Sequence, residues 1–343
     1  MRGAAIATIL EMTVLPSSQP GAEIDLDLAA SPCRIVTDPG RGFAGKRVTI
    51  DDARTAFGRP VPDVRFHLPA PELRDLVTAY VVVESTGPLS DFLHPEWANI
   101  RFVLWGSWEI QDFATGAMVP AIAPALFGPT DRTRQFASPA GGLLGVGLTP
   151  MGWVRLVGGR AATIANQVVP LGDVLGTNGE NLARTLSACT DDAGRVALLD
   201  ATLMRRIRAG GKHSPLALKA HDVLVSGSAA DVAAFAEQLE VPQAKLNRLC
   251  LRVFGFTPKR LLRRQRFLRT LGAVRDSLDR PLTELIDPAY YDQAHFNRDF
   301  KAFMGTTPRA YFSSPREVLR RAVEERLRVI GAPVQGLHPS KRD

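Results

Sequence analysis

The spacing of apolar residues changes near residue 150 of the chain. From Val64 to Leu148, short runs rich in β-branched and aromatic residues, such as "AYVVVEST" and "NIRFVLWGSWEI", alternate with Gly, Pro and Asp. Runs of this length and spacing are typical of antiparallel strands in a barrel or sandwich. The pattern therefore predicts a β-rich domain that can enclose a pocket.

After Pro150 the apolar residues recur at helical spacing. Two segments each carry one apolar stripe, with Leu182, Leu186 and Cys189 in the first and Val196, Leu199 and Leu203 in the second. Gly210 and Gly211 follow the second segment and end its helix. Because such stripes must be buried, these helices either pack on the β-rich domain or serve as a hinge or dimer interface.

A segment in the carboxy-terminal part occurs twice. "PQAKLNRLCLRVFGFTP" begins at Pro242, "DQAHFNRDFKAFMGTTP" begins fifty residues later at Asp292, and the two align without a gap. The aligned copies share Gln243/Gln293, Ala244/Ala294, Asn247/Asn297, Arg248/Arg298, Gly255/Gly305, Thr257/Thr307 and Pro258/Pro308. The Gly ends one helix and the Thr-Pro pair begins the next. Together with a preceding helix ending near Leu239, the first copy predicts a helix-turn-helix unit.

Each repeated helix has one apolar face and one polar face. At about 100° per residue, the apolar face of the first copy carries Leu246, Leu249, Cys250 and Val253, and that of the second carries Phe296, Phe300 and Phe303. A duplicated fold unit needs only its core and its turns to recur, yet the polar face recurs as well. Gln and Arg side chains read the edges of adenine and guanine in the major groove, where a helix fits. The polar faces are therefore predicted to read DNA bases.

A basic helix is predicted between the two copies. Residues 258 to 275 span about 27 Å as a helix, a length that with its turns can hold two reading helices one turn of DNA apart. Cationic and His side chains on this helix and around the reading helices are expected to contact phosphates. These are Lys245, Lys259, Arg260, Arg263, Arg264, His295, Lys301 and Arg309.

Charge is distributed unevenly along the 343 residues. Residues 1–210 carry a net charge of −2, whereas residues 211–343 carry +9, which accounts for the overall +7. A basic half of this kind indicates a polyanionic partner, with double-stranded DNA as the first candidate. The sequence contains no run of about 18 apolar residues, so no membrane span is predicted.

Motifs for catalysis and cofactor binding are missing from the sequence. It has no nucleophile elbow, phosphate loop or dinucleotide fingerprint, so the chain is expected to be neither an enzyme nor a cofactor binder. His67, His94 and Glu96 lack the spacing of metal ligands, and no metal site is predicted. Three scattered cysteines without C-x-x-C predict free thiols. The alternative is an enzyme or ligand-binding protein whose functional site is the β domain and whose basic helical module is appended.

Residues of about 216–313 resemble the AraC/XylS-type DNA-binding domain, most specifically in "YYDQAHFNRDFKAFMGTTPRAYF". The resemblance implies a bacterial, cytoplasmic one-component transcription regulator, usually an activator, whose amino-terminal domain senses an effector or mediates dimerisation. Its expected partners are promoter DNA, an unknown small molecule, RNA polymerase and a second copy of the chain. Carried over residue by residue, the base-reading positions are Gln243, Ala244, Asn247, Arg248, Gln293, Ala294, Asn297 and Arg298.

The predicted fold class is α+β, with an antiparallel, cupin-like barrel or sandwich followed by an all-α domain of two helix-turn-helix units joined by a long helix. The expected organisation has five parts. They are a partly ordered leader at 1–60, a β-rich sensor domain at 61–170, connector or dimerisation helices at 171–211, the DNA-binding domain at 212–314, and a charged tail at 315–343, to which no function is assigned beyond possible phosphate contact.

Overall fold

The computed structural model describes residues 61–176, 178–209, 214–276, 286–287, 290–314, 316–332 and 334–339. The predicted leader at 1–60 lies outside these residues. So does most of the stretch that would carry the first helix of the second helix-turn-helix unit. All of the described residues belong to one compact unit.

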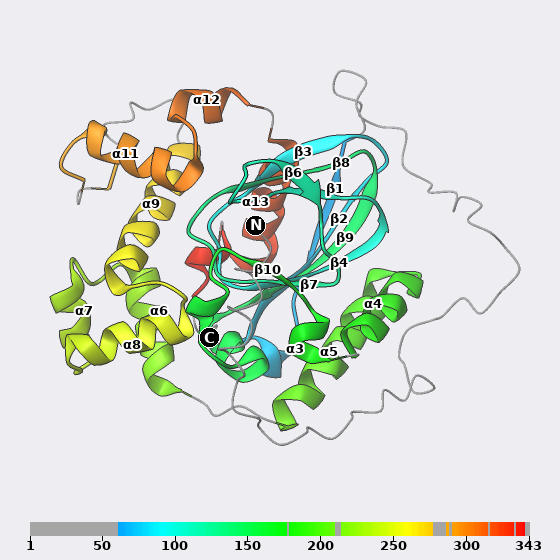
Figure 1. Ribbon diagram of the computed structural model, residues 1–343, viewed down its shortest axis with the longest axis horizontal. Helices are drawn as coiled ribbons and strands as arrows, with labels where there is room; N and C mark the ends of the chain where they lie inside the picture. The colour runs from blue at the N-terminus through cyan, green and yellow to red at the C-terminus, as the bar shows by residue number, and fades with distance from the viewer. Residues whose placement is uncertain are drawn as a thin grey trace, which may run out of the picture. The chain divides into compact units, whose positions relative to one another are not determined.

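The amino-terminal part forms two antiparallel sheets, which confirms the predicted β-rich architecture (Figure 1). In spatial order, the larger sheet holds β1 (Asp63–His67), β2 (Val77–Ser85), β9 (Gly141–Leu148), β4 (Asn99–Gly106), β7 (Ala125–Phe127) and β10 (Val168–Pro170). The smaller sheet holds β3 (Leu89–Leu93), β8 (Arg134–Ser138), β5 (Glu109–Gln111) and β6 (Met118–Pro120).

The central strands of the larger sheet are buried on both faces. Along β4, Ile100 and Phe102 join the main hydrophobic core, while the alternate residues Asn99 and Arg101 line a cavity between the sheets. Successive side chains of a strand point to opposite faces, so one strand serves both purposes. Burial on both sides explains why these strands read as nearly continuous apolar runs in the sequence.

The connector helices α4 (Asn178–Ala188) and α5 (Asp192–Ala209) pack against the β domain. Their apolar stripes are buried in the main core, as the burial of Leu186 and Leu199 shows. On α5, Asp200 accepts a 2.7 Å hydrogen bond from the Tyr80 hydroxyl of β2. Of the alternatives that the sequence left open, the structure therefore shows packing on the chain's own β domain.

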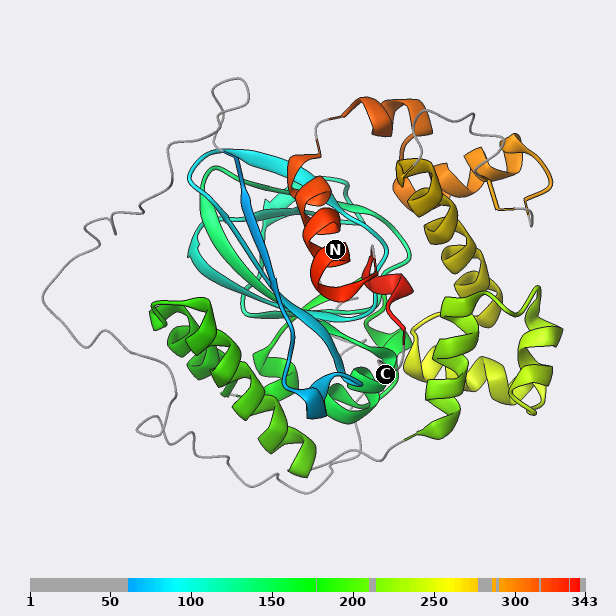
Figure 2. The same cartoon turned by 180° about the vertical axis from the view of Figure 1, so that it is seen from behind.

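Among the described residues from Pro215 to Ser313, the chain is mainly helical (Figures 1 and 2). The helices here are α6 (Pro215–Ser226), α7 (Val232–Gln238), α8 (Gln243–Val253), α9 (Pro258–Asp276), α11 (Gln293–Met304) and α12 (Pro308–Ser313). Short polar side chains begin several of them: Asp231 accepts from the Ala234 N–H and Asp292 from the His295 N–H. Such caps satisfy backbone donors that the first turn leaves unpaired.

Helix α9 contributes to two hydrophobic cores. Its Leu261 is buried with Leu246 and Leu249 of α8, in a core continuous with that of the β domain. Further along, Phe267 and Leu271 pack with the apolar face of α11 in a second core. One helix thus supports both repeated helices.

The carboxy-terminal tail is folded onto the β domain. Helix α13 (Glu317–Ile330) packs against β1 and β3, and a 3₁₀ turn follows at Gln335–Leu337 (Figure 2). Val318, Val323 and Ile330 are buried, so the helix is amphipathic and its apolar side is covered. The segment that the sequence described only as a charged tail is part of the folded β domain.

Two further observations concern cysteines and membranes. The expectation of free thiols is wrong at Cys189, which is disulfide-bonded, whereas Cys250 is a buried free thiol. Within the described part of the chain, every helix is too short or too polar to cross a bilayer.

Candidate DNA-binding surface and internal pocket

The polar faces of α8 and α11 are exposed on the outside of the helical part. All eight predicted base-reading residues are exposed: Gln243, Ala244, Asn247, Arg248, Gln293, Ala294, Asn297 and Arg298. The apolar face of each helix is buried, with Leu246 at 0% exposure in α8 and Phe296 at 0% in α11. The core therefore fixes which side of each helix faces outward, and both copies present the same four residue types.

Helix α9 links these two faces. It contains 19 residues, which corresponds to a length of about 28 Å. Gly255 ends the first repeated helix with φ of 85°, a left-handed conformation that favours glycine, and Gly305 ends the second with φ of 70°. The repeated Gly and Thr-Pro thus act as the sequence predicted, as stop and start signals for helices.

Lys245, Lys259, Lys301 and Arg309 of the predicted phosphate contacts are exposed. His295 is half-buried beside Tyr290, with the ring centroids 5.1 Å apart. Arg260 and Arg263 are partly exposed, but each is already paired with a buried carboxylate, Asp131 and Asp299 respectively. Only part of the predicted cationic set therefore faces solvent without an ion pair to another described residue.

Arg264 is a correction to the predicted phosphate contacts. Its exposure is 0%, and its guanidinium lies 3.8 Å from the centroid of the Trp97 ring. It donates a 2.9 Å hydrogen bond to the Thr130 carbonyl. Burial lowers the pKa of Arg264 to about 9, so the group stays charged at neutral pH. A side chain enclosed in this way is unavailable to a DNA phosphate.

Asp299 is a buried, paired carboxylate at the second repeated helix that the sequence analysis missed. Its exposure is 1%, and it pairs with Arg263 and, at 3.8 Å, with Arg266 of α9. The Tyr290 hydroxyl donates to it at 3.2 Å. The repeat itself held the signal, because Asp299 occupies the core position that Leu249 fills in the first copy. The ion pairs anchor α11 to α9.

The β domain contacts the DNA-binding part at defined points. Asp131, at 0% exposure, pairs with Arg260 and accepts a 3.0 Å hydrogen bond from the Asn166 amide. The Thr133 N–H donates a 2.7 Å hydrogen bond to the Phe303 carbonyl at the end of α11. A third contact joins His94 Nε2 and the Tyr311 hydroxyl at 2.7 Å. The linking helix α9 and the second repeated helix with its following helix are thus tied to the β domain.

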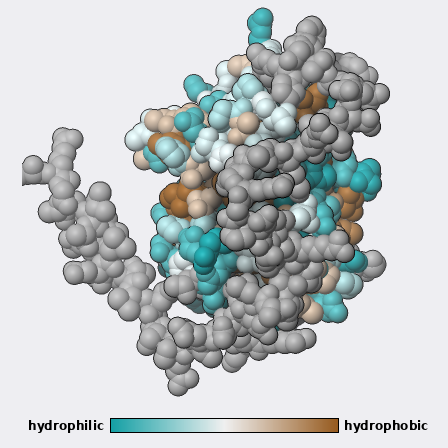
Figure 3. Space-filling model, turned by 90° about the vertical axis from the view of Figure 1, so that its right-hand side faces the viewer, coloured by the Kyte–Doolittle hydropathy of each residue, from teal (hydrophilic) through white to brown (hydrophobic). Residues whose placement is uncertain are grey.

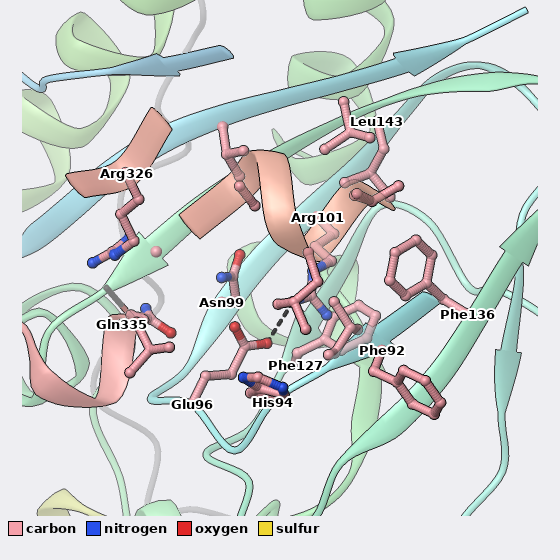
Figure 4. A pocket seen from close by; sticks show the side chains of 18 of the residues that line it. Phe92, His94, Glu96, Asn99, Arg101, Phe127, Phe136, Leu143, Arg326 and Gln335 are labelled. Carbon is pink, nitrogen blue, oxygen red and sulfur yellow. Dashed lines mark hydrogen bonds and ion pairs between the residues drawn. The ribbon is translucent and has the colours of Figure 1, made fainter. Parts of the chain in front are cut away.

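A cavity of about 180 Å³ lies inside the β domain. Figure 4 shows aromatic side chains and Leu143 toward one end, and Asn99, Arg326 and Gln335 toward the other. Arg101 pairs with Glu96 within the cavity, and its guanidinium lies 4.1 Å from the centroid of the Phe127 ring. The cavity is apolar over most of its lining, with a few convergent polar groups, as is usual for small-molecule sites.

The exterior is less suited to an apolar ligand than this cavity. Large exposed hydrophobic residues among the described positions are Trp105, Met118, Ile122, Tyr291 and Leu327. On the face that Figure 3 presents, hydrophobic residues form small groups between hydrophilic ones. Isolated apolar residues of this kind are normal for a protein surface.

Each residue considered for a metal site has a different protein partner. His67 bonds to Asp192, His94 to Tyr311, and Glu96 pairs with Arg101. Within the described ranges, no group of three or more His, Cys, Asp or Glu residues is placed to hold a metal ion.

Comparison with known families identifies the helical part. A family model described as a helix-turn-helix domain matches residues 235–314. This range includes both repeated helices and α9. No curated protein matches the chain at a significant level.

Several solved structures resemble the chain at low identity. ToxT from Vibrio cholerae is similar over 68% of this chain and 96% of its own, with 11% identity and a TM-score of 0.37. ToxT from Vibrio cholerae O395 bound to (E)-4-(8-methylnaphthalen-1-yl)but-3-enoic acid is similar over 73% of this chain and 98% of its own, with 9% identity and a TM-score of 0.39. The AraC-like transcriptional activator CuxR is similar over 61% of this chain and 86% of its own, with 14% identity and a TM-score of 0.23. TM-scores below 0.5 carry no inference from these proteins to this chain.

Proposed function

We propose that this chain, whose residues 235–314 match a helix-turn-helix domain model, is a sequence-specific regulator of transcription of the AraC type. The observation that carries the proposal is the recurrence of one exposed polar face on α8 and α11. In each copy Gln, Asn and Arg project from a helix whose opposite side is buried. The two faces read bases in successive major grooves, and the exposed cations around them contact phosphates.

The β domain in this proposal is the sensor. It contains the cavity, and it contacts α9 and α11 through Asp131, Thr133 and Trp97. A molecule that binds in the cavity changes the DNA-binding part only if its affinity differs between two arrangements of these contacts. The contacts supply the physical connection that such a difference requires.

Further parts of the proposal rest on the family resemblance. We propose that the chain works in the bacterial cytoplasm as an activator that contacts RNA polymerase, and that it acts by binding and not by catalysis. A second copy of the chain is the other expected partner. Because the apolar stripes of α4 and α5 are covered by the β domain, a dimer would use another surface. Sedimentation of the purified chain with and without promoter DNA measures this directly.

Salt-dependent binding tests the proposed function. Binding of the purified chain to fluorescent double-stranded promoter fragments is measured by anisotropy between 50 and 200 mM salt. Four exposed cations that contact phosphates predict an affinity loss of about a hundredfold over this range. The matched variant Lys245→Ala is expected to show a shallower salt dependence than the wild type. Retention of DNA that does not depend on salt, or no retention, contradicts the proposal.

A further inference from the structure

The carboxy-terminal segment forms one wall of the internal cavity. Helix α13 contributes Val318, Ala322, Val323 and Arg326, and the 3₁₀ turn contributes Gln335. Figure 4 shows Arg326 and Gln335 at the polar end of the cavity, with Asn99 of β4 near them. The cavity is therefore assembled from strands near the start of the described chain and from the last helical elements.

Specific hydrogen bonds attach this wall to the rest of the protein. The Asp91 carboxylate of β3 accepts a 2.8 Å hydrogen bond from the Leu319 N–H and so caps α13 from another element. Gln335 Nε2 donates to the Ala98 carbonyl at 3.1 Å and to the Leu148 carbonyl at 3.0 Å. Gln265 of α9 donates to the Gly336 carbonyl at 2.6 Å. The wall is thus fastened both to the β domain and to α9.

A glycine makes room for this attachment. A Cβ atom at Gly147 of β9 would lie 2.9 Å from Gln335 Nε2, closer than side-chain carbons normally approach. Since both donor hydrogens of Gln335 are used by backbone carbonyls, the orientation of its amide is fixed. Its carbonyl oxygen, Oε1, is therefore held in a defined place.

Several polar atoms of the cavity lining are buried without a hydrogen-bond partner among the described residues. Trp108 Nε1 is one of them, and three more are Gln335 Oε1, Asn99 Oδ1 and Arg101 Nη1. The exposures of these last three residues are 7%, 6% and 7%, and all three line the cavity. Buried polar atoms are nearly always paired in native proteins, because leaving them unpaired is costly. In these three residues, two acceptors and one donor that face one cavity point to a bound molecule.

The chemistry of these atoms defines the ligand. Two acceptor oxygens require a ligand group that donates hydrogen bonds, and Arg101 Nη1 requires one that accepts. A hydroxyl or a primary amide does both, whereas a carboxylate only accepts. The charge of Arg101 is already matched by Glu96, and the Arg326 guanidinium lies 5.8 Å from the Phe66 ring centroid. Phe92, Phe127 and Phe136 offer an apolar region for the remainder of the molecule.

We propose that the β domain and the carboxy-terminal segment together form a binding site for a small neutral molecule with a hydroxyl or amide head and a ring-sized apolar body. A cavity of about 180 Å³ suits this size, because one of about 150 Å³ accommodates benzene. The inference rests on the proposed function insofar as it takes this molecule to be the effector. Because Gln335 is next to Gly336, which Gln265 of α9 holds, the ligand contacts a segment tied to the DNA-binding part.

Four probes with the same ring test the chemical class. Benzyl alcohol, benzamide, benzoate and toluene are titrated into the full-length chain, and binding is followed by calorimetry and by thermal unfolding. Benzyl alcohol and benzamide are expected to bind at least tenfold more tightly than benzoate or toluene. Tight binding of benzoate, equal binding of toluene, or binding of none of the four at millimolar concentration overturns the proposal.

Variants locate the site. Gln335→Leu and Asn99→Leu are each expected to abolish the advantage of benzyl alcohol over toluene, and the second keeps the test valid if the first does not fold. Gln135→Leu, at an exposed position of β8, is the matched control and leaves the preference unchanged. An unchanged preference in both Gln335→Leu and Asn99→Leu contradicts the assignment. DNA retention of the probe-free protein is measured in parallel, so failure of the proposed function is seen separately.

Discussion

The Arg264 guanidinium lies 3.8 Å from the centroid of the Trp97 ring, with both side chains almost fully buried. Arg264 belongs to α9, which links the repeated helices α8 and α11, and Trp97 lies two residues before β4. His221 of α6 meets the same ring edge-on, with a centroid distance of 5.6 Å. Some cations of this basic helix thus lie in the protein interior and others face solvent.

Arg264→Ala is expected to lower the free energy of unfolding by about 2–4 kcal/mol, because it removes a buried cation–π contact and leaves the Thr130 carbonyl unpaired. Urea unfolding measures the change. Lys259→Ala is the matched control, since Lys259 is exposed on the first turn of the same helix. It should leave stability within about 0.5 kcal/mol of the wild type while weakening DNA binding. A stable Arg264→Ala variant with reduced salt dependence would show that Arg264 contacts phosphate after all.

Asp131→Asn is expected to strengthen binding to DNA. The buried Asp131 carboxylate holds Arg260, and its loss frees that guanidinium, which is already partly exposed, for a phosphate. Each added phosphate contact steepens the slope of log K against log salt by about 0.9. The slope is measured by anisotropy on one DNA fragment for wild type, Asp131→Asn and Asp131→Asn/Arg260→Ala. The double variant should return to the wild-type slope, and identical slopes in all three would contradict a role for this ion pair.

His221 makes stability depend on pH. Burial lowers the pKa of His221 to about 3 from its ordinary value of 6.5, so between these values the unfolded chain binds the proton and the folded chain does not. Stability from this residue is present above pH 6.5 and is lost as the pH falls toward 3. From pH 6.5 to pH 5 the wild type should lose about 2 kcal/mol more than His221→Leu.

Urea unfolding at a series of pH values checks this prediction. Asp91 acts with the opposite sign in the same window, because burial raises its pKa to about 6 and the folded state favours its protonated form. Since Asp91 is present in both proteins, the difference between wild type and His221→Leu isolates His221. Parallel stability curves from pH 7 to pH 5 would show that His221 does not titrate on unfolding.

The reading faces could be predicted because the information is local. A fifty-residue repeat and the helical period together place Gln243, Asn247 and Arg248 on one side, and the structure exposes that side. Contact with DNA bases stays a prediction. The strands were predictable for the same reason, since alternation and turn residues are read within a short window.

The burial of Arg264 and the docking of α13 depend on distant partners. Thr130 lies 134 residues before Arg264, and Asp91 lies 228 residues before Leu319. For Arg264 a local signal did exist. Leu261, Arg264 and Leu268 fall on one stripe of α9, so the arginine occupies a position of the buried face. Periodicity shows which face of a helix is buried. It does not show which distant element that face packs against.

The measurement that tests the central claim most directly is selection of bound sequences from a random double-stranded DNA library, with the wild type, Arg248→Ala and Arg298→Ala. The wild type is predicted to enrich two sequence blocks one helical turn, about 10.5 base pairs, apart. Each variant should lose base preference in one block only, with an affinity loss of about 1–3 kcal/mol for the wild-type site. Absence of an enriched sequence, or variants that select the same two blocks as the wild type, would contradict the assignment of α8 and α11 as reading helices.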